Sequence, residues 1–140
     1  MSSYKRHKAY SYLSFFVLLN FINMLDRNLL AAFGPSIVSD LSLSYAHFGM
    51  LTGIVFVGFY AVFGVFMGAL ADRYNRSRII AAGVALWSVM TALTGATTNF
   101  IQNVFARMFV GVGESTLSPS AISMLNDVFP PSKRGTAIGI

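Results

Sequence analysis

Four ionisable side chains lie inside stretches that are otherwise almost entirely apolar. Asp26 and Arg27 stand together in the segment NFINMLDRNLLAAF, and Arg107 and Glu114 begin and end the segment RMFVGVGE. A charged group is costly in such a stretch, about 2.5–3.5 kcal/mol at the centre of a membrane helix on insertion scales. Charges that persist there predict a functional interior in which each charged group faces protein or water rather than lipid.

The spacing of these residues predicts which charges meet. Asp26 lies nine residues before Pro35 and Arg107 seven residues after Phe100, which corresponds to depths of about 13 Å and about 10 Å at the helical rise of 1.5 Å per residue. We therefore expect an Asp26–Arg107 ion pair. Glu114 follows Arg107 by seven residues, two helical turns, so it lies on the same face.

The chemistry expected of these acids is proton transfer. A carboxyl group in a low-dielectric cavity can bind and release a proton near neutral pH. Glu114 and Asp26 are therefore candidates for proton coupling, with Arg27 or Arg107 left to pair with Glu114. The alternative interpretation is that these charges only hold helices together.

Small residues and one proline indicate how the helices around these charges pack. Gly111 and Gly113 thin the helix that carries Glu114, and Pro119 predicts a bend near Ser115 because it removes a backbone donor. Two small-x-x-x-small pairs, Gly49/Gly53 and Gly64/Gly68, predict close helix contacts. Phe56, Phe59, Phe63 and Phe66 are expected to face lipid or to pack between helices.

The composition identifies the solvent around these elements. Only 11% of the residues are charged and 55% are hydrophobic, whereas an ordinary soluble domain carries about 25% charged residues. Residues 41–71 and 79–106 contain no formally charged residue, and each run exceeds the ~20 residues that cross a bilayer. The sequence predicts an integral, multi-pass, all-α membrane protein.

The apolar runs predict four transmembrane helices and the start of a fifth. The expected helices cover residues 10–33, 48–71, 79–97 and 101–125, and the fifth begins at about residue 133. Ser44 is expected to cap the second helix through its side-chain oxygen. The first run follows basic residues, as in a secretory signal, but its length and its Asp-Arg pair favour a retained helix.

The basic residues predict the orientation of the chain in the membrane. Apart from Arg27 and Arg107, they fall in three segments, at residues 5–8, 73–78 and 133–134, and the intervening connections near Asp40 and Asn99 contain no Lys or Arg. Because basic loops stay in the cytoplasm, the N-terminus is expected to be cytoplasmic, in the plasma (inner) membrane.

The loop GALADRYNRSR has more charge than orientation alone requires. Gly68 permits close helix contact, and Asp72, Arg73 and Arg76 follow it in a tight turn. One interpretation is a charged latch that closes the cytoplasmic ends of the helices, and the other is a solvated loop that only sets orientation.

Several function classes are not expected. The chain has no Cys, and its two His and five acids show no metal-ligand spacing, so no metal or other cofactor is predicted. The positive charge is divided among loops rather than gathered into a nucleic-acid surface. No nucleophile–base pair is evident, so the protein is not expected to be an enzyme.

Two of these segments resemble signatures of the major facilitator superfamily. GALADRYNRSR is similar to the loop between helices two and three, and RMFVGVGESTLSP is similar to the fourth-helix pattern of that superfamily. The Asp-Arg pair, LWS at residues 86–88 and GVGES resemble spinster-type members. VFPPSKRGTAIGI also resembles the organic-anion:cation symporters.

The resemblance implies a fold and a function. It implies twelve helices in two halves around a central cavity, with alternating access, and it assigns residues 1–140 to part of the N-terminal six-helix half. Asp26, Arg27 and Glu114 would serve proton coupling or substrate binding, and Arg27 with Arg107 would suit an anionic group. Gly68, Asp72, Arg73 and Arg76 would form the cytoplasmic gate.

The expected function is secondary active transport of a small amphipathic or organic-anion solute, coupled to protons. The expected partners are that solute, protons, the lipid bilayer and the C-terminal half of the transporter, because the sequence ends where a fifth helix begins and is interpreted as a fragment. The alternative is a membrane fragment or helix-assembly module that does not transport.

Overall fold

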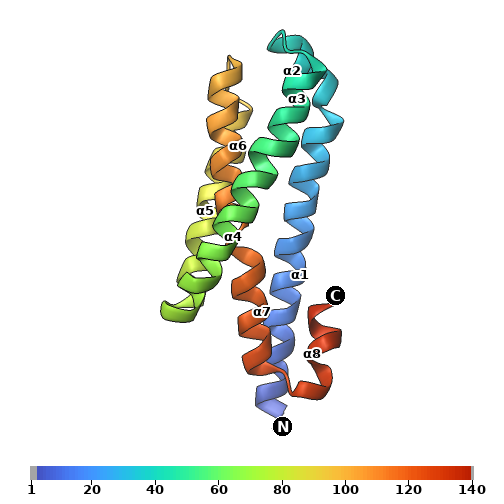
Figure 1. The fold of residues 1–140 in the computed structure, drawn as a ribbon. Helices are drawn as coiled ribbons and strands as arrows, with labels where there is room; N and C mark the ends of the chain where they lie inside the picture. Colours follow the sequence, from blue (N-terminus) through green and yellow to red (C-terminus); the bar gives the residue numbers. More distant parts are fainter. Residues whose placement is uncertain (1–2, 140) are drawn as a thin grey trace.

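The structure, a computed structural model, describes residues 3–139; its regular secondary structure in that range is entirely helical, with no strand (Figure 1). The chain forms α1 (Ser3–Ala32), α2 (Gly34–Asp40), α3 (Tyr45–Met50), the π-helix η1 (Leu51–Val55), α4 (Phe56–Arg73), α5 (Arg76–Thr94), α6 (Phe100–Glu114), α7 (Leu117–Val128) and α8 (Pro131–Ile138). The prediction of an all-α protein is confirmed.

Three stretches of the described chain are long and apolar enough to cross a membrane. They are His7–Ala32, Tyr45–Arg73 and Arg76–Thr94. The second of these joins α3, η1 and α4 into one rod, because the π-helix continues the helical path with a single widened turn. Most of the apolar side chains on these stretches remain exposed, as expected for surfaces that face lipid.

The fourth predicted helix differs from the structure. Residues 101–125 do not form one helix, because Ser115 and Thr116 separate α6, of 15 residues, from α7, of 12. The freed carbonyl groups are partly satisfied locally: the Ser115 hydroxyl donates to the Val112 carbonyl at 2.7 Å and the Thr116 hydroxyl to the Gly113 carbonyl at 2.8 Å. Pro119, in the first turn of α7, cannot donate to the carbonyl of Ser115.

The connection after the first helix contains a short helix of its own. Residues Gly34–Asp40 form α2, since Pro35 fits the first turn of a helix. Ser44 then begins the next helix, and its side-chain oxygen accepts the His47 backbone N–H at 3.2 Å. The predicted Ser44 cap is therefore confirmed.

Loops of alternate position lie at the same end of the bundle. Figure 1 shows the N-terminus and the α4–α5 and α7–α8 connections toward one end, and the α1–α2 and α5–α6 connections toward the other. The basic segments at residues 73–78 and 133–134 thus share one end. Lys5 and Arg6 have side chains outside the described part of the chain.

The glycines that bring helices together are not the predicted pairs. A Cβ atom on Gly49, Gly53 or Gly64 would meet no atom within 4 Å, and one on Gly68 would only touch Pro119, at 3.9 Å. The closest approach instead joins α5 to α6, where a Cβ on Gly113 would lie 2.8 Å from the Gly83 carbonyl oxygen. Within the described chain, Gly83 and Gly113 therefore make the close contact, and the predicted close contacts of the small-x-x-x-small pairs stay a prediction.

Candidate functional site

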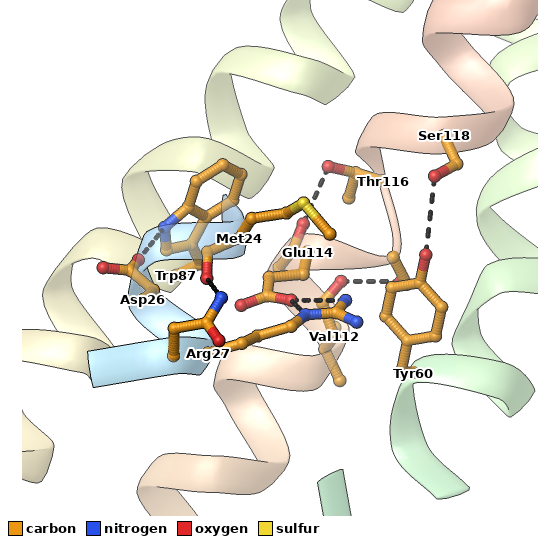
Figure 2. Close-up of polar contacts among 12 residues, drawn as sticks. Met24, Asp26, Arg27, Tyr60, Trp87, Val112, Glu114, Thr116 and Ser118 are labelled. Carbon is orange, nitrogen blue, oxygen red and sulfur yellow. Dashed lines mark hydrogen bonds and ion pairs between the residues drawn. The ribbon is translucent and has the colours of Figure 1, made fainter. Parts of the chain in front are cut away.

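The centre of the site is an ion pair between α1 and the end of α6. The Arg27 Nε and Nη2 atoms both donate to Oε2 of Glu114, at 3.0 Å and 2.8 Å (Figure 2). The Glu114 side chain is only 1% exposed, whereas that of Arg27 is 41% exposed. The pair therefore joins a buried acid to a base that reaches the surface of the described chain.

The second arginine of the site lies beside the first without an acid of its own. The guanidinium groups of Arg27 and Arg107 lie 4.9 Å and 4.8 Å from the ring centre of Phe56. Phe56 begins α4 directly after the π-helix and is buried. An aromatic face attracts cations, so Phe56 holds two like charges in one place.

The predicted Asp26–Arg107 ion pair is wrong. Among the described residues Asp26 forms no ion pair; its Oδ2 accepts the indole N–H of Trp87 at 3.0 Å (Figure 2). Arg107 is buried, and its Nε has no hydrogen-bond partner within the described chain. Successive helical residues point about 100° apart, so Asp26 faces α5 while Arg27 faces α6.

The charges are divided between two pockets. Arg27 and Glu114 line a pocket of about 170 Å³, together with Asn23, Tyr60 and Ser118. The Tyr60 hydroxyl lies 3.4 Å from that of Ser118, so α4 and α7 close one side of this pocket.

Asp26 and Arg107 line the second pocket, of about 310 Å³, with Asp40 near the α2 end. Within this pocket Arg107 keeps an unpartnered Nε, whereas Asp26 accepts the indole N–H of Trp87. The arrangement can bind an anion at Arg107 and can exchange a proton or an anion at the Arg27–Glu114 pair.

Two glycines place Glu114 in this arrangement. A Cβ on Gly111 would lie 2.9 Å from the Phe56 carbonyl oxygen, and one on Gly113 would lie 2.8 Å from both Cβ and N of Trp87. The end of α6 is thus pressed between the backbones of α4 and α5. This close packing fixes the depth and rotation of the residue that follows, Glu114.

Aromatic residues of the site were not found from the sequence. Phe56 was expected only to face lipid or to pack between helices, and Tyr60 was not considered; Phe56 is buried. Trp87 entered only through a resemblance, although it is the single tryptophan of the chain and stands in an uncharged run. A lone indole there is a usable signal, because its N–H needs a partner when buried.

The basic loop contains a second ion pair. Arg76 Nη1 donates to Oδ2 of Asp127, near the end of α7, and Arg76 Nε donates to the Ala71 carbonyl at 3.3 Å. Asp127 was not predicted as its partner. Asp72 and Arg73 form no ion pair among the described residues; they line a pocket of about 590 Å³ that Lys8 and Asp127 share.

Comparison with known proteins places these features in a common framework. Residues 16–140 match the family model described as Major Facilitator Superfamily. The chain is 32% identical over 126 residues to a hexuronate transporter of Bacillus subtilis (strain 168), covering 90% of this chain and 30% of that protein. It is 32% identical over 134 residues to protein spinster homolog 1 of Xenopus laevis, covering 94% of this chain and 25% of that protein.

A solved structure extends this similarity to three dimensions. The chain superimposes with a TM-score of 0.84 and 37% identity on a bacterial homolog of the human lysosomal transporter Spinster, in an inward-facing and unoccupied conformation. The match covers 99% of this chain and 28% of that one. The chain thus spans less than a third of the length of each of these proteins.

Proposed function

Because the chain belongs to the major facilitator superfamily and is similar to its spinster members, we propose that it forms the N-terminal part of a secondary active transporter. Members of this superfamily are integral multi-pass membrane proteins, and the family indicates a transporter rather than an enzyme. The proposed transporter moves its solute by alternating access between two halves. In this chain α6 and α7 together would form the fourth crossing and α8 would begin the fifth.

The observation that carries the proposal is the buried Arg27–Glu114 pair. Either partner can be taken by a ligand: a proton can neutralise Glu114, and an anion can bind Arg27. Each event weakens the Arg27–Glu114 ion pair, which competes with both ligands. Binding of the proton or of the anion therefore favours binding of the other. A helix-joining pair would need no open pocket, yet this one lines a pocket and has a half-exposed arginine.

We propose an organic anion as the solute and the proton as the coupling ion. Arg107 supports the choice of anion, because it is buried and its Nε has no partner in the described chain. One relative is named for transport of hexuronate, a carboxylate. An amphipathic solute related to that of the spinster proteins is the alternative.

The proposed orientation places the N-terminus and the basic loops in the cytoplasm. Gly68, Asp72, Arg73 and Arg76 would then lie at the cytoplasmic gate, with Arg76 held by Asp127 in the conformation described. Breaking this exposed pair would accompany movement of the gate.

The test uses the complete transporter in proteoliposomes with radiolabelled hexuronate. Wild-type protein should accumulate the label when a pH gradient is imposed and should also exchange label at equal pH. Glu114→Gln should lose gradient-driven accumulation by at least tenfold but retain exchange, because the site still binds the anion and no longer carries the proton. Lys133→Gln, which removes an exposed charge that lines neither pocket of the site, is the control and should behave as wild type.

The outcomes separate the alternatives. Gradient-driven accumulation that survives Glu114→Gln would show that the coupling role is wrong. A parallel loss of accumulation, exchange and thermal stability would favour a purely structural pair. If wild-type protein carries no hexuronate, a thermal-shift screen of organic anions and lysolipids decides between the two solute classes.

A further inference from the structure

A groove on the flank of the bundle lies outside the charged site. It has a volume of about 480 Å³ and is bordered by α4, α5 and α6. Its walls are apolar, formed chiefly by Met67, Leu70, Ile79, Leu86 and Val112. None of the four charged residues of the candidate site lines it.

One end of the groove is polar. Tyr74, Asn75 and Arg78 border it where α4 gives way to α5. Tyr74 is 66% exposed, and Arg78 is exposed as well. Asn75 caps the N-terminus of α5, since its side-chain oxygen accepts the Arg78 backbone N–H at 3.3 Å.

The guanidinium group of Arg78 is available to a ligand. Its neighbour Arg76 turns toward α7 and binds Asp127, whereas no described residue forms an ion pair or hydrogen bond with the Arg78 side chain. The two arginines in the first turn of α5 therefore differ: Arg76 joins α5 to α7, and Arg78 stands at the end of an apolar groove.

The position of the groove in the membrane defines the chemistry that fits. Two of its three walls belong to the stretches long and apolar enough to span a bilayer, Tyr45–Arg73 and Arg76–Thr94, so its apolar part lies at the depth of the acyl chains. Arg78 lies at the loop end of those helices, at the level of the head groups. A basic residue beside a groove between membrane helices suits an anionic lipid head group.

We propose that this groove binds one anionic phospholipid of the leaflet next to the α4–α5 loop. The phosphate accepts hydrogen bonds from Arg78, Tyr74 stands at the interface as aromatic side chains commonly do, and one acyl chain fills the apolar groove. A small soluble anion would leave the apolar walls without contacts. A zwitterionic lipid offers the same phosphate, but its own cationic group weakens the attraction to Arg78.

The bound lipid would link α4 and α5, which otherwise are joined mainly through their contacts with α6. α4 and α5 each pack extensively on α6 and contact each other little. An acyl chain between them adds contact where the protein supplies little, so lipid binding should raise thermal stability. This binding is independent of transport, because it involves neither Arg27 nor Glu114.

The test measures the melting temperature of the purified, delipidated protein in detergent during titration with phosphatidylglycerol or with phosphatidylcholine of identical acyl chains. Phosphatidylglycerol should raise the melting temperature, and phosphatidylcholine should raise it far less. Arg78→Gln should weaken the apparent phosphatidylglycerol affinity about fivefold, the value expected for one basic residue near the head groups. Lys133→Gln removes a cation from the other basic loop and is the matched control.

A second variant tests the acyl chain without changing charge. Ala82 lines the groove and is exposed, so Ala82→Phe should fill it and abolish the response to phosphatidylglycerol. Equal stabilisation by the two lipids, or a full response in Arg78→Gln or in Ala82→Phe, would overturn the proposal. If Arg78→Gln does not fold, Ala82→Phe and the comparison of head groups still decide.

Discussion

Two arginine–carboxylate pairs in this chain have the same chemistry, but their carboxylates lie in opposite surroundings. In the first, Glu114 is 1% exposed and receives two hydrogen bonds from Arg27. In the second, Asp127 is 64% exposed and Arg76 is 30% exposed. A buried pair cannot be broken cheaply because water does not replace the lost partner, whereas an exposed pair contributes about 0–1 kcal/mol.

The difference separates two roles. The exposed pair can open and close with little free energy, as a gate between conformations requires. The buried pair changes its state only when a proton or an anion replaces the lost partner. The same type of ion pair thus has two roles: Arg76–Asp127 opens easily, and Arg27–Glu114 opens only when a ligand binds.

The largest effect is expected for Arg27→Leu, which leaves the buried carboxyl of Glu114 without its cation. We expect unfolding free energy to fall by about 2–3 kcal/mol, less than the ~3–5 kcal/mol of fully buried pairs because Arg27 is half-exposed. Denaturant unfolding of the purified protein in detergent measures it. The double variant Arg27→Leu/Glu114→Leu should recover part of the loss, and a double variant less stable than the single one would contradict the assignment.

An intermediate effect is expected where the buried pair is supported rather than broken. In Gly113→Ala the new methyl group would lie 2.8 Å from the Gly83 carbonyl oxygen, so α5 and α6 must separate at a cost of about 1–2 kcal/mol. Gly64→Ala is the control, because its methyl group meets nothing within 4 Å. Identical melting temperatures for the two variants would show that this contact does not support Glu114.

The smallest effect is expected for Arg76→Leu, which breaks the exposed pair. The unfolding free energy should fall by about 0.5 kcal/mol, and the difference should disappear in about 1 M salt because screening already weakens an exposed pair. The loss in Arg27→Leu should persist at the same salt concentration. The comparison fails if Arg76→Leu costs as much as Arg27→Leu or is equally insensitive to salt.

The sequence was sufficient for the class of protein and for its family. Long uncharged runs can only be satisfied as helices in a bilayer, and two local signatures pointed to the superfamily that the family model matches. It also located the four charged residues of the site, since an ion among apolar residues is conspicuous, although only Arg107 and Glu114 are buried.

The partners of those charges could not be predicted in the same way. Depth along a helix follows from counting residues, but a rotation of about 100° per residue decides which neighbour a side chain meets. Equal depth suggested that Asp26 meets Arg107. The orientation of Asp26 around the axis of α1 instead brings its carboxylate to the indole N–H of Trp87. The close contact at Gly83 was not predicted for a related reason. A single glycine forms no recognisable sequence pattern, and its role depends on which helix packs against it.

The interruption at Ser115 and Thr116 has a consequence for biosynthesis. α6 and α7 are each shorter than the ~20 residues that a bilayer-spanning helix needs, and α6 carries both Arg107 and Glu114. Such a segment is weakly retained by the translocation machinery on hydrophobicity alone. We therefore expect its entry into the membrane to depend on α1 and α5, which are synthesised earlier and supply Arg27 and Gly83 as contacts for it.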